Sequence, residues 1–248
     1  MTSDHLGHAV SVYLRRIRID NRYLLVFLVI VALGCSTTTP VVYHDVFLDD
    51  PYAFTWDEDE RGRVWLDTDS FANVMNMLES DRPALNLYRE NVTYHKVVEF
   101  FARVAGSKEI ALPILYHADR NDLPLTLVFS LVWVESRFSP RAVNQNPASI
   151  DRGLFQLNSL SFRHLSVEDF FDPEISAYHG TNYLRGTFDQ STDEEMAVAI
   201  YNAGRRRVIA GQTPSSTLVY VDRIMRYRND LDRDFEKFIR AHFPAPTV

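Results

Sequence analysis

The chain of 248 residues is poor in the residue types that support several kinds of site. It has one cysteine, Cys35, so it cannot form an intramolecular disulfide. Its eight histidines show no HExxH or similar ligand spacing, so we expect no metal site and no cofactor. Basic residues are not in excess either, with 26 Lys and Arg against 33 Asp and Glu. We therefore expect no nucleic-acid partner, because such partners require a basic surface.

Glycine is also sparse, with 9 residues, whereas helix-forming residues are common. This balance favours a mainly α-helical fold over a barrel or a sandwich. Hydrophobic residues make up 46% of the chain and charged residues 24%, as in ordinary globular proteins. The length is sufficient for one large core with appendages or for two small domains.

The first 35 residues have the features of an export signal. Arginines at 15–22 precede an apolar run at 23–33, which is followed by Gly34 and Cys35. As a helix, this run would span only about 16 Å, roughly half of a bilayer's hydrocarbon core. The Leu-Gly-Cys ending resembles a bacterial lipobox, in which the cysteine is acylated and becomes the mature N-terminus. An uncleaved membrane anchor is the alternative.

We accordingly predict that residues 1–35 are a lipoprotein signal peptide ending at Cys35, and that residues 36–42 are a tether. The lipid on Cys35 would anchor the protein to a membrane on the periplasmic side of the cell envelope. Ser36 after the cysteine fits sorting to the outer membrane of a Gram-negative cell. Residues 43–106 form an N-terminal extension to which the sequence assigns no role.

Helical periodicity begins near residue 91. Val97, Phe100, Phe101 and Val104 fall at positions i, i+3, i+4 and i+7, which predicts a helix over 91–105. Proline and amide residues predict a loop at 139–152. Further helices are predicted at 108–119, 125–137, 159–165, 173–187, 192–202 and 215–228, with a C-terminal helix and tail at 229–248.

Glu135 is the most unusual acidic residue, because it ends the most apolar of these helices directly after Val132, Trp133 and Val134. Burial disfavours an ionised carboxylate and raises its pKa. A carboxyl group that keeps its proton near neutral pH suits general-acid cleavage of a glycosidic bond. The alternative is an ordinary helix end that faces solvent.

Four segments, taken in order, resemble the soluble lytic transglycosylase (SLT) family of bacterial cell-wall enzymes. They are Glu135-Ser136-Arg137-Phe138, Gly153-Leu154-Phe155-Gln156-Leu157-Asn158, Ala199-Ile200-Tyr201-Asn202-Ala203-Gly204 and Tyr220-Val221. The resemblance implies a lysozyme-like, multi-helix catalytic domain over residues 107–228. Its substrate would be the glycan strand of peptidoglycan.

The resemblance also implies a mechanism with one carboxyl group. Glu135 would protonate the glycosidic oxygen and then deprotonate the C6 hydroxyl of the muramyl sugar, which gives a 1,6-anhydro product. This route needs no second carboxylate, unlike the usual pair of glycosidases. The sequence specifies no paired partner for Glu135, although Asp151 is the nearest acid in the motif region.

The remaining motif residues are expected to bind substrate. Gln156 and Asn202 would position the sugar through amide hydrogen bonds, and Tyr201 and Tyr220 would line the cleft. Tyr220 is also expected to hydrogen-bond Glu135. Gly153 would let the backbone approach the sugar closely. Ser136 would be a structural or hydrogen-bonding residue.

Some positions depart from the family pattern or leave alternatives open. Asp151-Arg152 replaces the commoner Gly-Ala pair, and the stretch 151–159 also resembles animal-type lysozymes. A lysozyme-type hydrolase and a catalytically silent peptidoglycan-binding lipoprotein therefore remain as alternatives. Arg205-Arg206-Arg207 would either meet stem-peptide carboxylates or form a solvated turn. The sequence identifies no protein partner in the envelope.

Overall fold

The computed structural model describes residues 61–246. Cys35, the predicted signal peptide and the tether lie outside the described residues. Within the described range, no helix combines the length and the apolar character needed to cross a bilayer.

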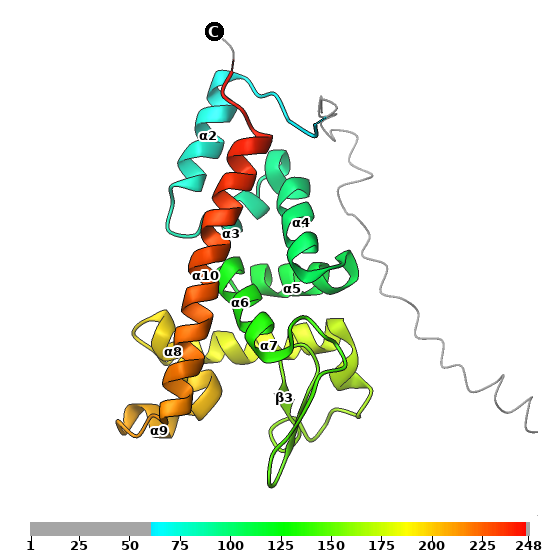
Figure 1. The fold of residues 1–248 in the computed structure, drawn as a ribbon, viewed down its shortest axis with the longest axis vertical. Helices are drawn as coiled ribbons and strands as arrows, with labels where there is room; N and C mark the ends of the chain where they lie inside the picture. Colours follow the sequence, from blue (N-terminus) through cyan, green and yellow to red (C-terminus); the bar gives the residue numbers. More distant parts are fainter. Residues whose placement is uncertain (1–60, 247–248) are drawn as a thin grey trace, which may run out of the picture. The chain divides into compact units, whose positions relative to one another are not determined.

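The described chain is mainly helical, as the composition predicted (Figure 1). The helices are α2 (Thr68–Leu78), α3 (Pro83–Tyr88), α4 (Asn91–Ala105), α5 (Lys108–Arg120), α6 (Leu125–Ser136), α7 (Pro173–Phe188), α8 (Glu194–Ala203), α9 (Arg205–Ile209) and α10 (Ser215–His242). A short 3-10 turn, Asp169–Phe171, precedes α7. The strands are β1 (Val143–Gln145), β2 (Ile150–Arg152) and β3 (Leu157–Asn158).

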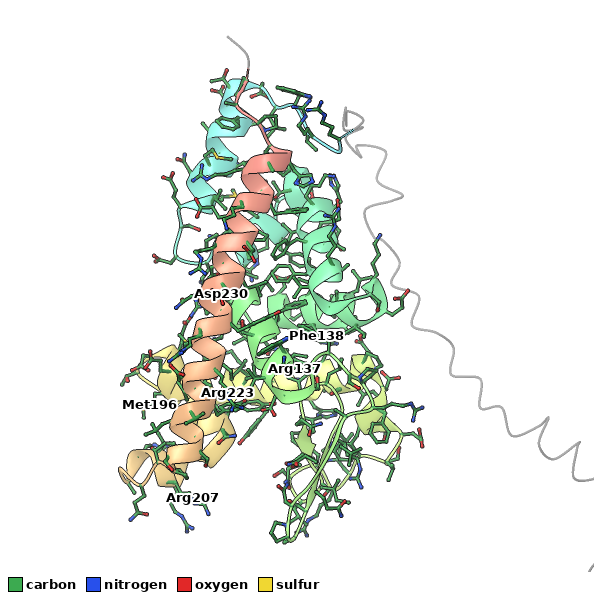
Figure 2. The ribbon with its side chains drawn as sticks, viewed as in Figure 1. Arg137, Phe138, Met196, Arg207, Arg223 and Asp230 are labelled. Carbon is green, nitrogen blue, oxygen red and sulfur yellow. The ribbon has the colours of Figure 1, made fainter. Side chains whose placement is uncertain are left out.

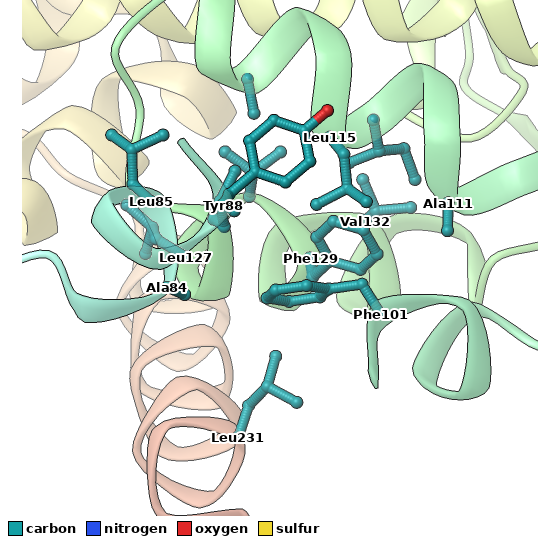
Figure 3. Close-up of a cluster of buried hydrophobic side chains, with 14 of the residues drawn as sticks. Ala84, Leu85, Tyr88, Phe101, Ala111, Leu115, Leu127, Phe129, Val132 and Leu231 are labelled. Atoms are coloured by element: carbon teal, nitrogen blue, oxygen red, sulfur yellow. The ribbon is translucent and has the colours of Figure 1, made fainter. Parts of the chain in front are cut away.

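Helix α6 is the centre of the core, because it is apolar on nearly every side. All residues from Leu125 to Val132 are buried, and the helix contacts α3, α5 and α10. Phe129 of α6 packs on Phe101 of α4, with ring centroids 4.3 Å apart (Figure 3). Burying an aromatic or large aliphatic side chain contributes about 1.5–3 kcal/mol, so this packing fixes the position of the end of α6.

Helix α10 corrects the prediction of two separate helices at the C-terminus. Its 28 residues continue without a break across the predicted boundary at residue 228. The segment contains neither glycine nor proline. Its buried residues, Thr217, Ile224, Leu231, Phe235 and Ile239, recur every four or seven positions and so lie on one face. That face contacts α4, α6 and α8, and α10 thereby joins the upper core to the lower end of the molecule in Figure 1.

The segment between α6 and α7 also differs from the prediction. The predicted loop at 139–152 contains β1 and β2, which pair antiparallel with each other, and β2 pairs antiparallel with β3. Residues 159–165 form turns and not the predicted helix. The Asn158 side chain accepts a hydrogen bond from the Leu160 backbone N–H, and the Asn158 carbonyl accepts two more from the turn. These local bonds compete with helix formation.

Candidate active site

Glu135 is the second-last residue of α6 and lies at the edge of the core, after the buried residues 125–132 of the same helix. Arg137 and Phe138 follow with φ of 54° and 58°, in the left-handed region, which stops the helix after Ser136. Such residues cost about 1–3 kcal/mol each and persist where surrounding contacts hold them. Here Phe138 is buried against the core, and the Arg137 guanidinium stacks 3.6 Å over the ring of Trp133. The helix therefore ends where Glu135 can face solvent on one side.

Glu135 faces a cavity of about 820 Å³. Its walls are the end of α6, the short sheet with the turns after it, parts of α7 and α8, and the first half of α10. The expected residues Glu135, Ser136, Gln156, Tyr201, Asn202 and Tyr220 all line it, as do Arg137, Asn144, Asn146, Asp151, Asn158, Tyr183, Gly204 and Arg223. Segments about 85 residues apart in the sequence thus meet around one carboxyl group.

The surroundings of Glu135 favour its protonated form. Burial is the largest influence and raises the pKa of this half-buried carboxyl group to about 7. The negative charge of Asp151 also raises the pKa of Glu135, whereas a hydrogen bond from Tyr220 lowers it. Near neutral pH the group therefore exchanges readily between acid and carboxylate, as a general acid that later acts as a base must do.

The hydrogen bond expected between Tyr220 and Glu135 is present. The Tyr220 hydroxyl on α10 donates to Glu135 Oε1 at 2.5 Å. Burial raises the pKa of Tyr220 well above its ordinary value, so the phenol keeps the proton that it donates. Tyr201 differs, because its hydroxyl donates 2.9 Å to the backbone carbonyl of Phe155. Tyr201 lines the cavity with its ring while its hydroxyl holds the neighbouring loop.

The two expected amide residues both line the cavity, and each makes hydrogen bonds to the protein through one end of its amide group. Gln156, at φ 47°, donates from Nε2 to the carbonyls of Ala142 and Gly153. Asn202 accepts at Oδ1 a 2.7 Å hydrogen bond from the Thr217 hydroxyl. Within the described residues, Gln156 Oε1 and Asn202 Nδ2 have no protein partner, so the cavity offers one amide acceptor and one amide donor.

Two expected substrate-binding residues have a structural role in this geometry. Gly153, at φ +78°, does not line the cavity. A Cβ there would lie 1.8 Å from the carbonyl oxygen of Phe170, so the close approach that glycine permits is to the protein itself. The Ser136 hydroxyl donates back to the Val132 carbonyl of its own helix at 3.1 Å. Ser136 thus lines the cavity with its hydroxyl already engaged.

The sequence left two readings open for Arg205-Arg206-Arg207, contact with stem-peptide carboxylates or a solvated turn, and their exposure favours the second. Arg205, Arg206 and Arg207 are exposed on α9 and do not line the cavity. Arg137 and Arg223 line it instead, and Figure 2 labels both, together with Arg207 of α9 near the bottom of the view. Arg223 follows Tyr220 by three positions, so both lie on the same side of α10. That spacing was a signal in the sequence that we did not use.

Asp151 and its neighbours are the part of the site that sequence reasoning missed. The strand register sets Asn144, Asp151 and Asn158 opposite one another in a row across the three strands. Such residues share one face of a sheet. Asp151 and Asn158 both lie in the stretch 151–159 that resembles animal-type lysozymes, but no motif includes Asn144, seven residues before Asp151. No group of three His, Cys, Asp or Glu side chains suited to a metal ion occurs among residues 61–246.

The mainly helical fold, with Glu135 at the end of a buried helix facing the cavity, is consistent with the lysozyme-like fold class. Residues 113–216 match the family model described as the transglycosylase SLT domain, so this segment is an SLT-type domain, as the sequence motifs predicted. The match lies inside the predicted 107–228 domain and includes Glu135, Gln156 and Asn202, but it ends before Tyr220. The family associates the chain with lytic-transglycosylase-type activity on peptidoglycan. No curated protein matches the chain.

Proposed function

We propose that the protein is a peptidoglycan lytic transglycosylase that cleaves the MurNAc–GlcNAc β-1,4 bond and leaves 1,6-anhydro-MurNAc ends. The observation that supports this most directly is the half-buried Glu135, with a pKa of about 7, hydrogen-bonded to Tyr220 in a large polar cavity. One carboxyl group that readily takes both protonation states can act first as acid and then as base.

In the proposed reaction Glu135 gives up one proton and later takes one back. The carboxylic acid gives its proton to the glycosidic oxygen, and the C1–O bond of the muramyl sugar breaks, which releases the neighbouring sugar as an alcohol. The resulting carboxylate then removes the proton of the C6 hydroxyl, and O6 bonds to C1. Glu135 is protonated again at the end. Tyr220 keeps its hydrogen bond to the carboxyl group throughout and holds it in position.

Gln156 and Asn202 support the binding of an N-acetylated sugar. An acetamido group presents one N–H donor and one carbonyl acceptor. The free Gln156 Oε1 and Asn202 Nδ2 supply the complementary acceptor and donor from two walls of the cavity. Gln156 is half-buried and Asn202 is exposed, so a bound sugar would itself cover these amides, and a sugar without the acetamido group would leave them unpaired.

A second function, lysozyme-type hydrolysis of the same bond, is favoured by the presence of Asp151 in the cavity. Glycosidases that use water normally employ two carboxylates. Hydrolysis would leave reducing MurNAc ends, and their mass exceeds that of anhydro ends by one water, about 18 mass units.

Product analysis separates these functions. The purified chain is incubated with isolated peptidoglycan, and the released fragments are examined by mass spectrometry. Anhydro ends support the transglycosylase, whereas reducing ends alone contradict it and support hydrolysis. Release of no fragments, with binding of the protein to the polymer, would instead support the silent binding protein.

We also propose that the protein is a lipoprotein anchored through Cys35 to an envelope membrane, on the periplasmic side. The support is the short apolar run that ends in Leu-Gly-Cys. Cys35→Ser should move the protein from the membrane fraction to the soluble fraction in cells. Continued tight membrane association of this variant would point to an uncleaved anchor.

A further inference from the structure

Asp151 is the second acidic residue of the cavity, and it reaches the cavity from a different element than Glu135. Glu135 ends helix α6, whereas Asp151 is the middle residue of strand β2. Among the described residues that line the cavity, these are the two acids. Asp151 lies near enough for its charge to act on Glu135.

Amide groups hold the Asp151 carboxylate in place. Asn158 Nδ2 donates to Oδ1 at 2.7 Å, and Asn146 Nδ2 donates to Oδ2 at 2.7 Å. Asn144 Nδ2 adds a longer contact of 3.4 Å to Oδ2. An acceptor-only carboxylate is satisfied by such donors, and its orientation is fixed by three separate backbone positions.

None of these partners carries a charge. The three side-chain donors to Asp151 among the described residues are all asparagines, and no ion pair of Asp151 occurs there, although Arg137 and Arg223 line the same cavity. Within residues 61–246 the negative charge of Asp151 is therefore oriented by amides but has no cationic partner. A fixed, unpaired charge in a cleft is what electrostatic stabilisation of a developing opposite charge requires.

We propose that Asp151 is a second catalytic residue, which stabilises the positive charge that develops on the muramyl ring as the glycosidic bond breaks. The inference rests on the proposed function. It also departs from the mechanism with one carboxyl group that the family resemblance implies. Asp151 forms no bond to the sugar in this role, so it is compatible with closure by O6 and with attack by water.

The first test compares Asp151→Asn with Asn146→Ala in steady-state cleavage of a defined peptidoglycan strand by the full chain. Asp151→Asn removes the charge and keeps the shape, and kcat should fall by about 10²-fold while KM changes little. Asn146→Ala removes one amide donor and keeps the charge, so kcat should fall less than tenfold. Melting temperatures of both variants accompany the kinetics.

Two results of this comparison would overturn the proposal. One is an Asp151→Asn variant with kcat within threefold of wild type. The other is an equal loss in both variants, which would mean that Asp151 only ties the strands together. A wild-type chain without activity would instead contradict the proposed function, so the two failures are distinguishable.

A second test does not depend on the folding of an Asp151 variant. In Glu135→Gln, binding is measured by calorimetry for a GlcNAc-type iminosugar with a protonated ring nitrogen and for the matched neutral lactam. Because Glu135 is then uncharged, a preference of tenfold or more for the cation must come from Asp151. Absence of any preference, including absence of binding by either compound, would overturn the proposal.

Discussion

The cavity has one carboxyl group on each of two walls, and their surroundings differ. The helix wall is the end of α6, which carries Glu135, and the sheet wall is strands β1 to β3, which carry Asp151. Glu135 lies at the end of an apolar helix, and among residues 61–246 its one side-chain hydrogen-bond donor is Tyr220. Asp151 stands in a polar sheet and accepts from three amides. Burial raises the pKa of Glu135 to about 7, whereas the amides give Asp151 the partners that a carboxylate needs.

This contrast assigns the two groups different chemical tasks. A carboxyl group that holds its proton can give it away, whereas a carboxylate whose orientation is fixed by donors can face a positive charge that develops in the substrate. In the proposed mechanism the helix wall therefore supplies proton transfer, and the sheet wall supplies geometry and charge. Substitutions on the helix wall should accordingly change the rate and its pH dependence, and a backbone substitution beside the sheet wall should change the free energy of unfolding.

The largest effect is expected for Glu135→Gln on the helix wall. Glutamine has the same shape but cannot transfer the proton, and kcat for peptidoglycan cleavage should fall by about 10³-fold or more. Turnover of isolated peptidoglycan by the purified variant measures this. A variant that retains a tenth of the wild-type rate would show that another group is the acid.

The next effect concerns folding of the sheet wall. Gly153→Ala forces a Cβ against the Phe170 carbonyl at a positive φ, so the free energy of unfolding should fall by about 3 kcal/mol. Gly106→Ala is the matched control, because Gly106 also has a positive φ, +83°, in the ordinary left-handed region, but a Cβ there would meet nothing within 4 Å. It should cost about 1 kcal/mol. Urea denaturation of both variants tests the difference, and equal losses would contradict it.

Much of the helix wall could be predicted from the sequence, and little of the sheet wall could. The long apolar run at 125–134 predicts helix α6, and it therefore also predicts that Glu135 lies at the end of this helix. Gln156, Asn202 and Tyr220 were found because each belongs to a motif. Their geometry supports that choice, although no measurement yet tests their roles.

The sheet wall escaped prediction for physical reasons. Strands of two or three residues are too short to show alternation, and the Asn residues that hold Asp151 indicate turns when read singly. The contact of Gly153 with Phe170 joins positions that no pattern connects. The single helix α10 was divided because the prediction followed the motif boundary and not the absence of helix breakers. Cys35 and the anchor lie outside the described residues and stay predictions.

A third prediction concerns the pH dependence of the free energy of unfolding, which follows from the raised pKa of Glu135. Its folded value of about 7 exceeds its ordinary value of 4.5, so the folded state holds the proton more tightly than the unfolded state. The contribution of Glu135 to the free energy of unfolding is therefore highest below pH 4.5, and it falls as the pH rises to about 7.

Glu135→Gln has no such proton, so its stability relative to wild type should grow over the same pH range. The gain should reach at most about 3 kcal/mol at pH 8 and vanish near pH 4. Urea denaturation at both pH values measures it. A gain that does not depend on pH would show that Glu135 has an ordinary pKa, which would remove the contrast between the walls.

The smallest effect is expected for Tyr220→Phe, which removes the one donor to Glu135. Loss of this hydrogen bond should reduce kcat by about tenfold, since a hydrogen bond to a charged group contributes roughly 1.5 kcal/mol. Because the bond lowers the pKa of Glu135, its removal should also move the alkaline limb of the pH–rate profile to higher pH. Tyr201→Phe is the control, because its hydroxyl donates to the Phe155 carbonyl and not to Glu135. It should lower the melting temperature without moving the limb. If both variants leave the limb in place, Tyr220 only lines the cavity, and burial alone sets the proton affinity of the helix wall.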